Sequence, residues 1–265
     1  QSILLAFDES VSLKHKIKTQ TYYQTEKRKQ DPMTWKIEFL NARLKENENA
    51  YFTYEMLEKN QRCKRVFYPR SALDAKFGKK NPYDIPKQKG EIRVVSCDMA
   101  FVQNKKNDNS VFYCMRLLPE CITYEKGYTS SVRVDNGYRR IVCYMEHVQG
   151  GDIVKQAVRI RQLYEDFEAD YIVLDTRNGG ITAYDLLARV MYDEERGFEY
   201  SPLACMNDDN IANRIKIEGA KPCIYAVNAS QKLNSDIAID FRSVLTSGKI
   251  DLLIPFEKAQ EEIKL

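Results

Sequence analysis

The sequence has no apolar run approaching the ~20 residues that a membrane-spanning helix needs. Its first residues also lack the basic start and apolar stretch of a secretory signal. These absences argue against membrane-anchored and secreted proteins. They predict a cytosolic protein with no membrane partner.

Cysteine pairing is missing as well. The seven cysteines are an odd number spread along the chain, and no two stand in a Cys-x-x-Cys arrangement. This spacing argues against a disulfide framework and against a structural zinc site. Because several lie inside apolar segments, as Cys97 does after Val94-Val95-Ser96, we expect reduced and mostly buried thiols.

A phosphate-binding glycine loop is also lacking, since none of the 11 glycines lies in a Gly-x-x-x-x-Gly-Lys-[Ser/Thr] sequence. The apolar residues 3–7 followed by Asp8-Glu9 fit the end of a Walker B strand. Without the glycine loop we expect no ATPase activity from this chain and no nucleotide cofactor. The chain starts in that apolar run without a methionine, so we expect a fragment of a longer protein.

A strong excess of positive charge is absent too. Lys and Arg number 41 against 38 Asp and Glu, which gives a formal net charge of +3. The balance permits nucleic-acid binding but does not indicate it. With 265 residues, 43% of them hydrophobic, the chain can form one large domain or two small ones.

Three regions follow from the local composition. Residues 1–60 are rich in helix formers with apolar anchors such as Trp35 and Leu40, which predicts a mainly helical segment. Residues 61–90 are basic and interrupted by proline and glycine, which predicts a linker with little regular structure. Residues 91–265 are expected to form the main domain.

The main domain shows alternating strand and helix patterns. Strands are predicted at residues 91–98, 110–118 and 171–175, and Asn136-Gly137 between β-rich flanks predicts a hairpin at 132–142. Helices are predicted at 152–168, capped by Asp152, and at 182–195, stopped by Gly197. Three early strands followed by helix, strand and helix indicate an RNase H-like α/β layer.

Two aspartates stand at the carboxyl ends of apolar strands, Asp98 after Val94–Cys97 and Asp175 after Ile172-Val173-Leu174. If these strands are neighbours, the carboxylates converge and repel unless a cation neutralises them. Oxygen ligands favour Mg²⁺ or Mn²⁺, and two such ions about 3.5–4 Å apart can hydrolyse a phosphodiester. Either aspartate alone is also explained as a turn former or a helix cap.

Several of these segments together resemble the nuclease motifs of phage terminase large subunits, the DNA-packaging proteins. The segments are residues 94–100, Asp108-Asn109-Ser110, and residues 171–175 followed by Gly179-Gly180. Upstream, residues 31–40 resemble the helical stretch that ends the ATPase region of this family. The resemblance covers most of the chain and is strongest at residues 91–180.

The resemblance implies a mixed sheet flanked by helices, an RNase H-like fold shared with Holliday-junction resolvases and integrases. It also implies an auxiliary β-hairpin, two metal ions, and cutting of concatemeric double-stranded DNA in the cytoplasm of the infected host cell. Asp98 and Asp175 would be metal ligands and catalytic residues, with Asp108 as a further acidic position. A portal protein and a small terminase subunit are the implied partners.

The family also has a third acidic ligand near the end of the nuclease. Asp236, Asp240 and Asp251 are available, but the first two have the spacing of a polar helix face and the third follows a turn. We expect the third ligand to lie beyond Leu265.

Contacts to DNA are expected mainly at phosphates. The predicted hairpin with Arg133, Arg139 and Arg140 is one candidate surface, and Lys232 is another. Each of these side chains alone is also explained as a solvated surface charge. His15 and His147 are expected to be structural or exposed, because hydrolysis with two metals needs no histidine base.

Two alternatives remain. One is a resolvase or integrase-like nuclease with the same acidic sheet, against which the helical region before residue 90 argues. The other is a non-catalytic assembly module of a packaging motor. Cleavage of DNA with Mn²⁺ separates an enzyme from such a module.

Overall fold

The computed structural model describes residues 50–100, 109–119, 122–126, 131–135, 137–149, 151–177 and 179–255, with the backbone alone at 122–126, 131–135 and 149. The chain divides into two compact units, Gln1–Tyr54 and Glu55–Leu265. Most of the segment expected to be helical, residues 1–60, lies outside the described residues and stays a prediction. The strands of the described residues all lie in the second unit, Glu55–Leu265.

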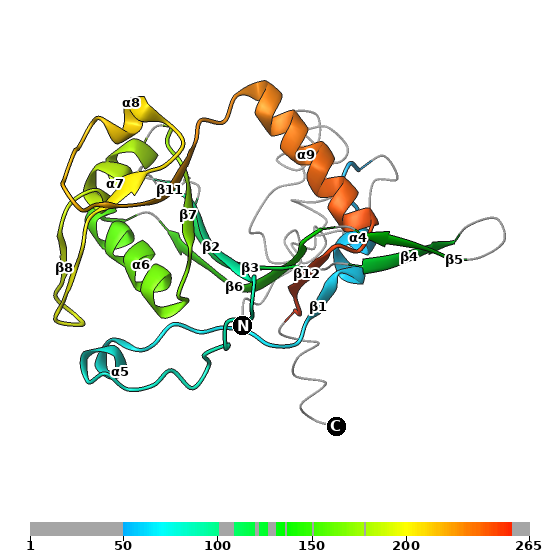
Figure 1. The fold of residues 1–265 in the computed structure, drawn as a ribbon, viewed down its shortest axis with the longest axis horizontal. Helices are drawn as coiled ribbons and strands as arrows, with labels where there is room; N and C mark the ends of the chain where they lie inside the picture. The colour runs from blue at the N-terminus through cyan, green and yellow to red at the C-terminus, as the bar shows by residue number, and fades with distance from the viewer. Residues whose placement is uncertain are drawn as a thin grey trace, which may run out of the picture. The chain divides into compact units, whose positions relative to one another are not determined.

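The centre of this unit is an eight-stranded sheet with the order β1-β12-β6-β3-β2-β7-β11-β10 (Figure 1). Its strands are β1 (Gln61–Cys63), β2 (Ile92–Asp98), β3 (Asn109–Leu118), β6 (Arg139–Gln149), β7 (Tyr171–Asp175), β10 (Leu203–Cys205), β11 (Lys221–Val227) and β12 (Ile250–Leu253). β3 runs antiparallel to β2 and β6, whereas β2, β7, β11 and β10 are parallel. The order β6-β3-β2-β7-β11 with these directions is that of an RNase H-like sheet, which confirms the predicted fold class.

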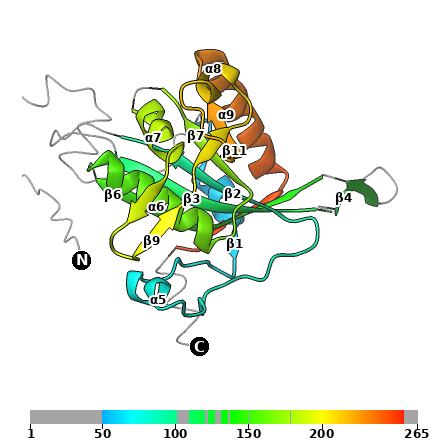
Figure 2. The ribbon, with the colours of Figure 1, turned by 60° about the vertical axis from the view of Figure 1, so that its left-hand side comes forward.

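Helices lie on both faces of the sheet (Figures 1 and 2). The helices of the described residues are α4 (Tyr54–Lys59), α5 (Ala72–Lys76), α6 (Ile153–Asp166), α7 (Gly180–Leu187), α8 (Asp209–Ala212) and α9 (Gln231–Thr246). α6 and α7 pack together on one face, and α9 lies over the other face. No described helix is long and apolar enough to cross a membrane.

The core forms where α6 meets the sheet. The predicted N-cap is confirmed, because the Asp152 side chain accepts a hydrogen bond from the backbone nitrogen of Val154. The apolar stripe of α6 includes Ile160 and Leu163, both 0% exposed, and packs on the strands through residues such as Leu174. All six described cysteines are free and buried, as expected from the sequence.

The predicted hairpin at 132–142 is wrong. β5 (Ser131–Asp135) pairs with β4 (Ile122–Lys126) in a separate two-stranded sheet, whereas β6 pairs along its length with β3. Gly137 does adopt a turn conformation, with φ of 68°, but it links two different sheets. The auxiliary hairpin is formed by β4 and β5 instead. The strand that the Asn-Gly signal assigned to the hairpin is β6, and it pairs with β3 over the whole length of β3.

The helix predicted at 182–195 begins at Gly180 and ends at Leu187. A short hairpin follows, β8 (Met191–Asp193) and β9 (Phe198–Tyr200), and Gly197 with φ of 64° lies in its turn. Asp193 explains the change, since it is 1% exposed and accepts hydrogen bonds from Gln162 Nε2 at 2.8 Å and Tyr200 Oη at 3.1 Å. Continuing the helix would break this buried polar contact.

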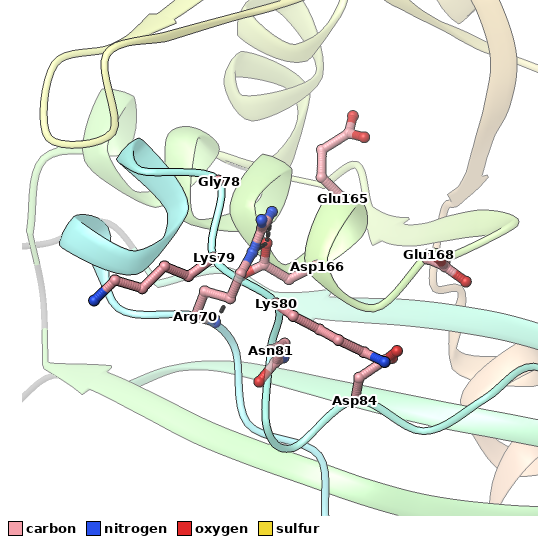
Figure 3. A pocket seen from close by; sticks show the side chains of 9 residues that line it. All are labelled: Arg70, Gly78, Lys79, Lys80, Asn81, Asp84, Glu165, Asp166 and Glu168. Carbon is pink, nitrogen blue, oxygen red and sulfur yellow. Dashed lines mark hydrogen bonds and ion pairs between the residues drawn. The ribbon is translucent and has the colours of Figure 1, made fainter.

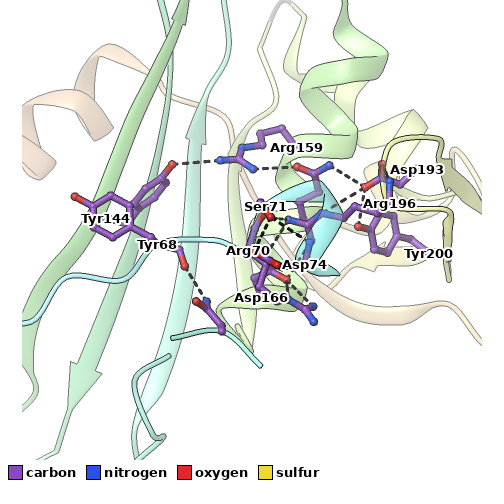
Figure 4. Close-up of polar contacts among 12 residues, drawn as sticks. Tyr68, Arg70, Ser71, Asp74, Tyr144, Arg159, Asp166, Asp193, Arg196 and Tyr200 are labelled. Atoms are coloured by element: carbon purple, nitrogen blue, oxygen red, sulfur yellow. Dashed lines mark hydrogen bonds and ion pairs between the residues drawn. The ribbon is translucent and has the colours of Figure 1, made fainter. Parts of the chain in front are cut away.

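The segment 61–90 has little regular structure, as its proline and glycine content indicates, yet it is packed into the unit. β1 joins the sheet beside β12, and Phe67 and Ile85 are only 1% and 2% exposed. Arg70 Nη2 forms an ion pair of 2.7 Å with Oδ1 of Asp166, whose side chain is fully buried. Arg196 Nη2 contacts the other oxygen of the same carboxylate at 2.9 Å (Figure 4). The segment that the sequence predicts as a linker is therefore part of the folded unit.

A buried ion-pair group ties the beginning of β2 to β3. Glu91 is fully buried at its side chain and contacts Arg93 Nε at 2.7 Å and Arg116 Nε at 2.8 Å. Arg93 also donates to the backbone oxygens of Phe167 and Ile85. Burial raises the pKa of Glu91, but hydrogen bonds from Arg116, the backbone of Gln88 and Arg93 outweigh it and hold this pKa at about 2.

Gly180 permits the close approach of α7 to the end of β7. A Cβ at this position would lie 1.6 Å from the backbone oxygen of Asp175. Only glycine leaves this space without moving the helix or the strand. The Gly179-Gly180 pair noted in the sequence therefore has a packing reason at its second residue.

Replacing Glu91 with Gln should destabilise the unit by about 3–5 kcal/mol, because two buried guanidinium groups lose their charge partner. Urea unfolding followed by circular dichroism measures this loss. Glu55→Gln, which removes an exposed ion pair with Lys59, is the control and should leave the urea midpoint unchanged.

The effect of Glu91→Gln should depend on pH in a defined direction. The pKa of Glu91 in the folded protein, about 2, lies below its ordinary value of 4.5. The Glu91 charge therefore adds its full share to the free energy of unfolding above pH 4.5, and this share is lost as the pH falls toward 2. The difference in urea midpoint between wild type and variant should therefore shrink over that range. An unchanged difference would contradict the assignment of the stabilisation to the Glu91 charge.

Gly180→Ala should lower the free energy of unfolding by about 1–3 kcal/mol, because the added methyl group overlaps the Asp175 backbone. Thermal unfolding checks this against Thr182→Ala, an exposed change in the same helix that should cost nothing measurable. Equal melting temperatures for the two variants would show that α7 can shift without penalty.

Candidate active site

The two predicted metal ligands end two adjacent strands. Asp98 is the last residue of β2 and Asp175 is the last residue of β7. These strands are parallel, and the preceding residues Cys97 and Leu174 are direct partners in the register. The carboxylates therefore stand side by side at the carboxyl edge of the sheet, where ligands of α/β sheets bind.

Both carboxylates lie on the face opposite α6 and α7. Cys97 and Leu174 are 3% and 0% exposed and belong to the core under those helices. Because successive residues of a strand point to opposite faces, Asp98 and Asp175 point away from that core. Asp98 is exposed and Asp175 is half-buried, so a ligand can reach both from solvent.

Local contacts fix the position of Asp175. Its Oδ1 accepts a hydrogen bond from the backbone nitrogen of Arg177 at 3.0 Å and lies 3.7 Å from Arg177 Nε. Thr176 donates its backbone N–H to the oxygen of Val227 at 2.9 Å, which holds the end of β7 against β11. The close packing at Gly180 limits movement from the other side.

The chain after Asp98 is held by Ser110, which is 0% exposed. Ser110 Oγ accepts a hydrogen bond from the backbone nitrogen of Ala100 at 2.9 Å and donates to Gln156 Oε1 at 2.8 Å. The contact links the segment after β2 to β3 and to α6. Ser110 belongs to the Asp108-Asn109-Ser110 motif, so at least this residue of the motif has a positioning role.

The electrostatics of the pair favour a cation. Among the described residues, the carboxylate of Asp98 has no hydrogen-bond or ion-pair partner, and Arg177 is the cation nearest to Asp175. Two adjacent carboxylates with one exposed counter-charge repel each other unless a further cation binds. Oxygen-only donors at this edge fit a hard divalent ion such as Mg²⁺ or Mn²⁺.

A third acidic ligand is not present in the part of the chain that the structure describes, where no three His, Cys, Asp or Glu residues are grouped to hold a metal. Asp251 is 5% exposed in β12, where Arg62 and Arg139 contact its carboxylate at 3.0 and 2.8 Å. Asp236 and Asp240 lie on exposed positions of α9. Asp108 lies outside the described residues, so its role stays a prediction.

The four predicted DNA-binding residues lie on three elements, β5, β6 and α9, and their role stays a prediction. Arg133 is in β5, where only the backbone is described, and Arg139 donates two hydrogen bonds of 2.9 Å to Asp251. Arg140 donates to the backbone oxygen of Tyr138, and Lys232 is exposed in the first turn of α9. Arg139 therefore has a structural task that the sequence did not reveal, since its partner is 112 residues away.

Two hollows among the described residues are not lined by Asp98 or Asp175, the acidic pair. One, of about 240 Å³, is lined by residues including Arg70, Lys79 and Asp166, and its charges are largely paired within the protein (Figure 3). The other, of about 630 Å³, lies between α9 and strands β3 and β6, with apolar lining such as Phe241 and Met145. In neither hollow are three described His, Cys, Asp or Glu residues grouped to hold a metal ion.

No protein-family model and no curated protein sequence matches the chain. The chain is similar in structure to the large terminase nuclease from thermophilic phage G20c. The structure with bound magnesium aligns with a TM-score of 0.42 and 13% identity, covering 79% of this chain and 77% of that chain. The structure with bound cobalt aligns with a TM-score of 0.40 and 14% identity over the same shares. Both structures are of the same large terminase nuclease.

Proposed function

We propose that this chain is a metal-dependent endonuclease that cuts double-stranded DNA, with Asp98 and Asp175 as its metal ligands. The observation that carries the proposal is their placement at the same level, on the same face, at the ends of two paired parallel strands. Neighbouring strands lie about 4.8 Å apart, so one divalent ion can bridge both carboxylates. A turn or capping role explains either aspartate alone but not their coincidence.

Asp98 and Asp175 would hold Mg²⁺ or Mn²⁺, as one ion or as two, and the metal when bound would supply an activated water and stabilise the leaving oxygen of a phosphodiester. The chain itself supplies the fixed carboxylates and a rigid frame. Arg177 and the Gly180 contact orient Asp175, and the Ser110 hydrogen bonds hold the segment behind Asp98. Small motions of these ligands would misplace the reacting atoms.

The open edge of the sheet is consistent with a large substrate. Asp98 is exposed and Asp175 is half-buried, so the pair is accessible to a duplex rather than enclosed for a small molecule. The motif resemblance extends the proposal to concatemeric DNA cut during genome packaging, with a portal protein and a small terminase subunit as partners. It also implies a third acidic ligand, for which we propose no described residue.

Two alternatives make different predictions. A resolvase or integrase-like enzyme would share the metal site but prefer branched or specific DNA over a plain duplex. A non-catalytic assembly module would not cut DNA at all. Plasmid and four-way junction substrates, compared in the same assay, separate the three.

Asp98→Ala and Asp175→Ala should each reduce Mn²⁺-dependent plasmid nicking by more than about 100-fold, because each removes a ligand of the same metal. Agarose electrophoresis of supercoiled plasmid with Mn²⁺, Mg²⁺ or EDTA measures the activity. The control is Glu199→Ala, an exposed acid on the separate β8–β9 hairpin, which should cut like the wild type.

Circular dichroism and thermal unfolding should show that all three variants keep the fold. Cleavage that survives either aspartate change would remove the acidic pair from the mechanism. Absence of metal-dependent cleavage both by this chain and by a version extended past Leu265 would favour the assembly module.

A further inference from the structure

A row of residues extends from the acidic pair across the sheet. Asp98 pairs directly with Val111 on β3, and Val111 pairs directly with His147 on β6. On the other side, Asp175 pairs with Val227 on β11. Because directly paired residues point to the same face, His147 lies on the same face and at the same level as Asp98 and Asp175.

His147 differs from its neighbour Glu146 in what it contacts. Glu146 points to the opposite face, where Arg159 binds it at 2.7 Å and Tyr144 donates to it at 2.6 Å. His147 is exposed, and among the described residues its imidazole has no hydrogen-bond or ion-pair partner. The ring is therefore available to a ligand at the carboxyl edge.

The distance between His147 and Asp98 suits a polymeric substrate. Two strand spacings place the His147 backbone about 10 Å from that of Asp98. Phosphates of one DNA strand follow each other about every 3.4 Å along the helix axis, so a strand cut at the acidic pair has further phosphates within reach of His147. An imidazole N–H is a suitable donor to a phosphate oxygen.

We propose that His147 binds a backbone phosphate of the DNA next to the cut and so positions the strand across the carboxyl edge. The inference rests on the proposed nuclease function and adds a substrate contact to it. It gives His147 no role as a base, so it agrees with the expectation that hydrolysis with two metals needs no histidine base. The row also sets the direction of the bound strand, across the strands of the sheet from β11 toward β6.

The first test separates binding from chemistry. His147→Ala should raise KM for a short fluorescent duplex about three- to tenfold, the value of one hydrogen bond, while kcat stays within about twofold. Val148→Ala is the matched control, since Val148 is the next residue on β6, points to the opposite face and is 36% exposed. It should leave both constants unchanged.

A second test uses a gain of charge. His147→Arg keeps a hydrogen-bond donor, so its KM should stay near the wild-type value and below that of His147→Ala. The variant also adds a cation, which should steepen the logarithmic salt dependence of DNA binding by about 0.9, the value of one neutralised phosphate. Val148→Arg adds the same charge on the other face and should not steepen it. Binding is measured by fluorescence anisotropy on the Asp98→Asn background, where cutting does not interfere.

The outcomes distinguish the two claims. If the wild type cuts DNA and loses activity with Asp98→Ala, but His147 and Val148 variants behave alike, the His147 contact is wrong and the nuclease stands. A fall in kcat with unchanged KM in His147→Ala would also overturn the positioning role. If neither this chain nor a version extended past Leu265 cuts DNA with Mn²⁺, the proposed function fails, and the role of His147 fails with it.

Discussion

The parallel pairing of β2 with β7 is the constraint on which the rest of the site depends. In this register Cys97 pairs with Leu174, both of them in the core. The next residues, Asp98 and Asp175, therefore lie just beyond the core and face solvent. Shifting either strand by one residue would bury one carboxylate under α6 or α7 and expose an apolar side chain. The fold therefore brings Asp98 and Asp175 together through the packing of the residues just before them.

The sequence predicted what depends on local pattern. The strands that carry Asp98 and Asp175, helix α6 with its Asp152 cap, and the RNase H-like order of elements all follow from periodicity and capping. The acidic pair could be proposed because apolar runs ended in aspartate. That β2 and β7 are neighbours, which the prediction had to assume, is a finding of the structure.

Long-range pairing could not be read from the sequence. The Asn136-Gly137 signal is a local preference, and the partner of β6 is chosen by the long register with β3. From the sequence alone Arg139 is interpreted as a solvated surface charge, because its partner Asp251 comes close only in the folded sheet. His147 likewise comes level with Asp98 only through the pairing of both strands with β3, so no local pattern connects the two residues.

If Asp98 and Asp175 act as one metal site, Mn²⁺ binding measured by electron paramagnetic resonance should depend on both carboxylates together. Wild type, Asp98→Asn, Asp175→Asn and the double variant are titrated under the same conditions. Each single change should weaken Mn²⁺ binding nearly as much as the double change, because the two carboxylates share an ion. Independent, additive losses, or binding that persists in the double variant, would contradict it.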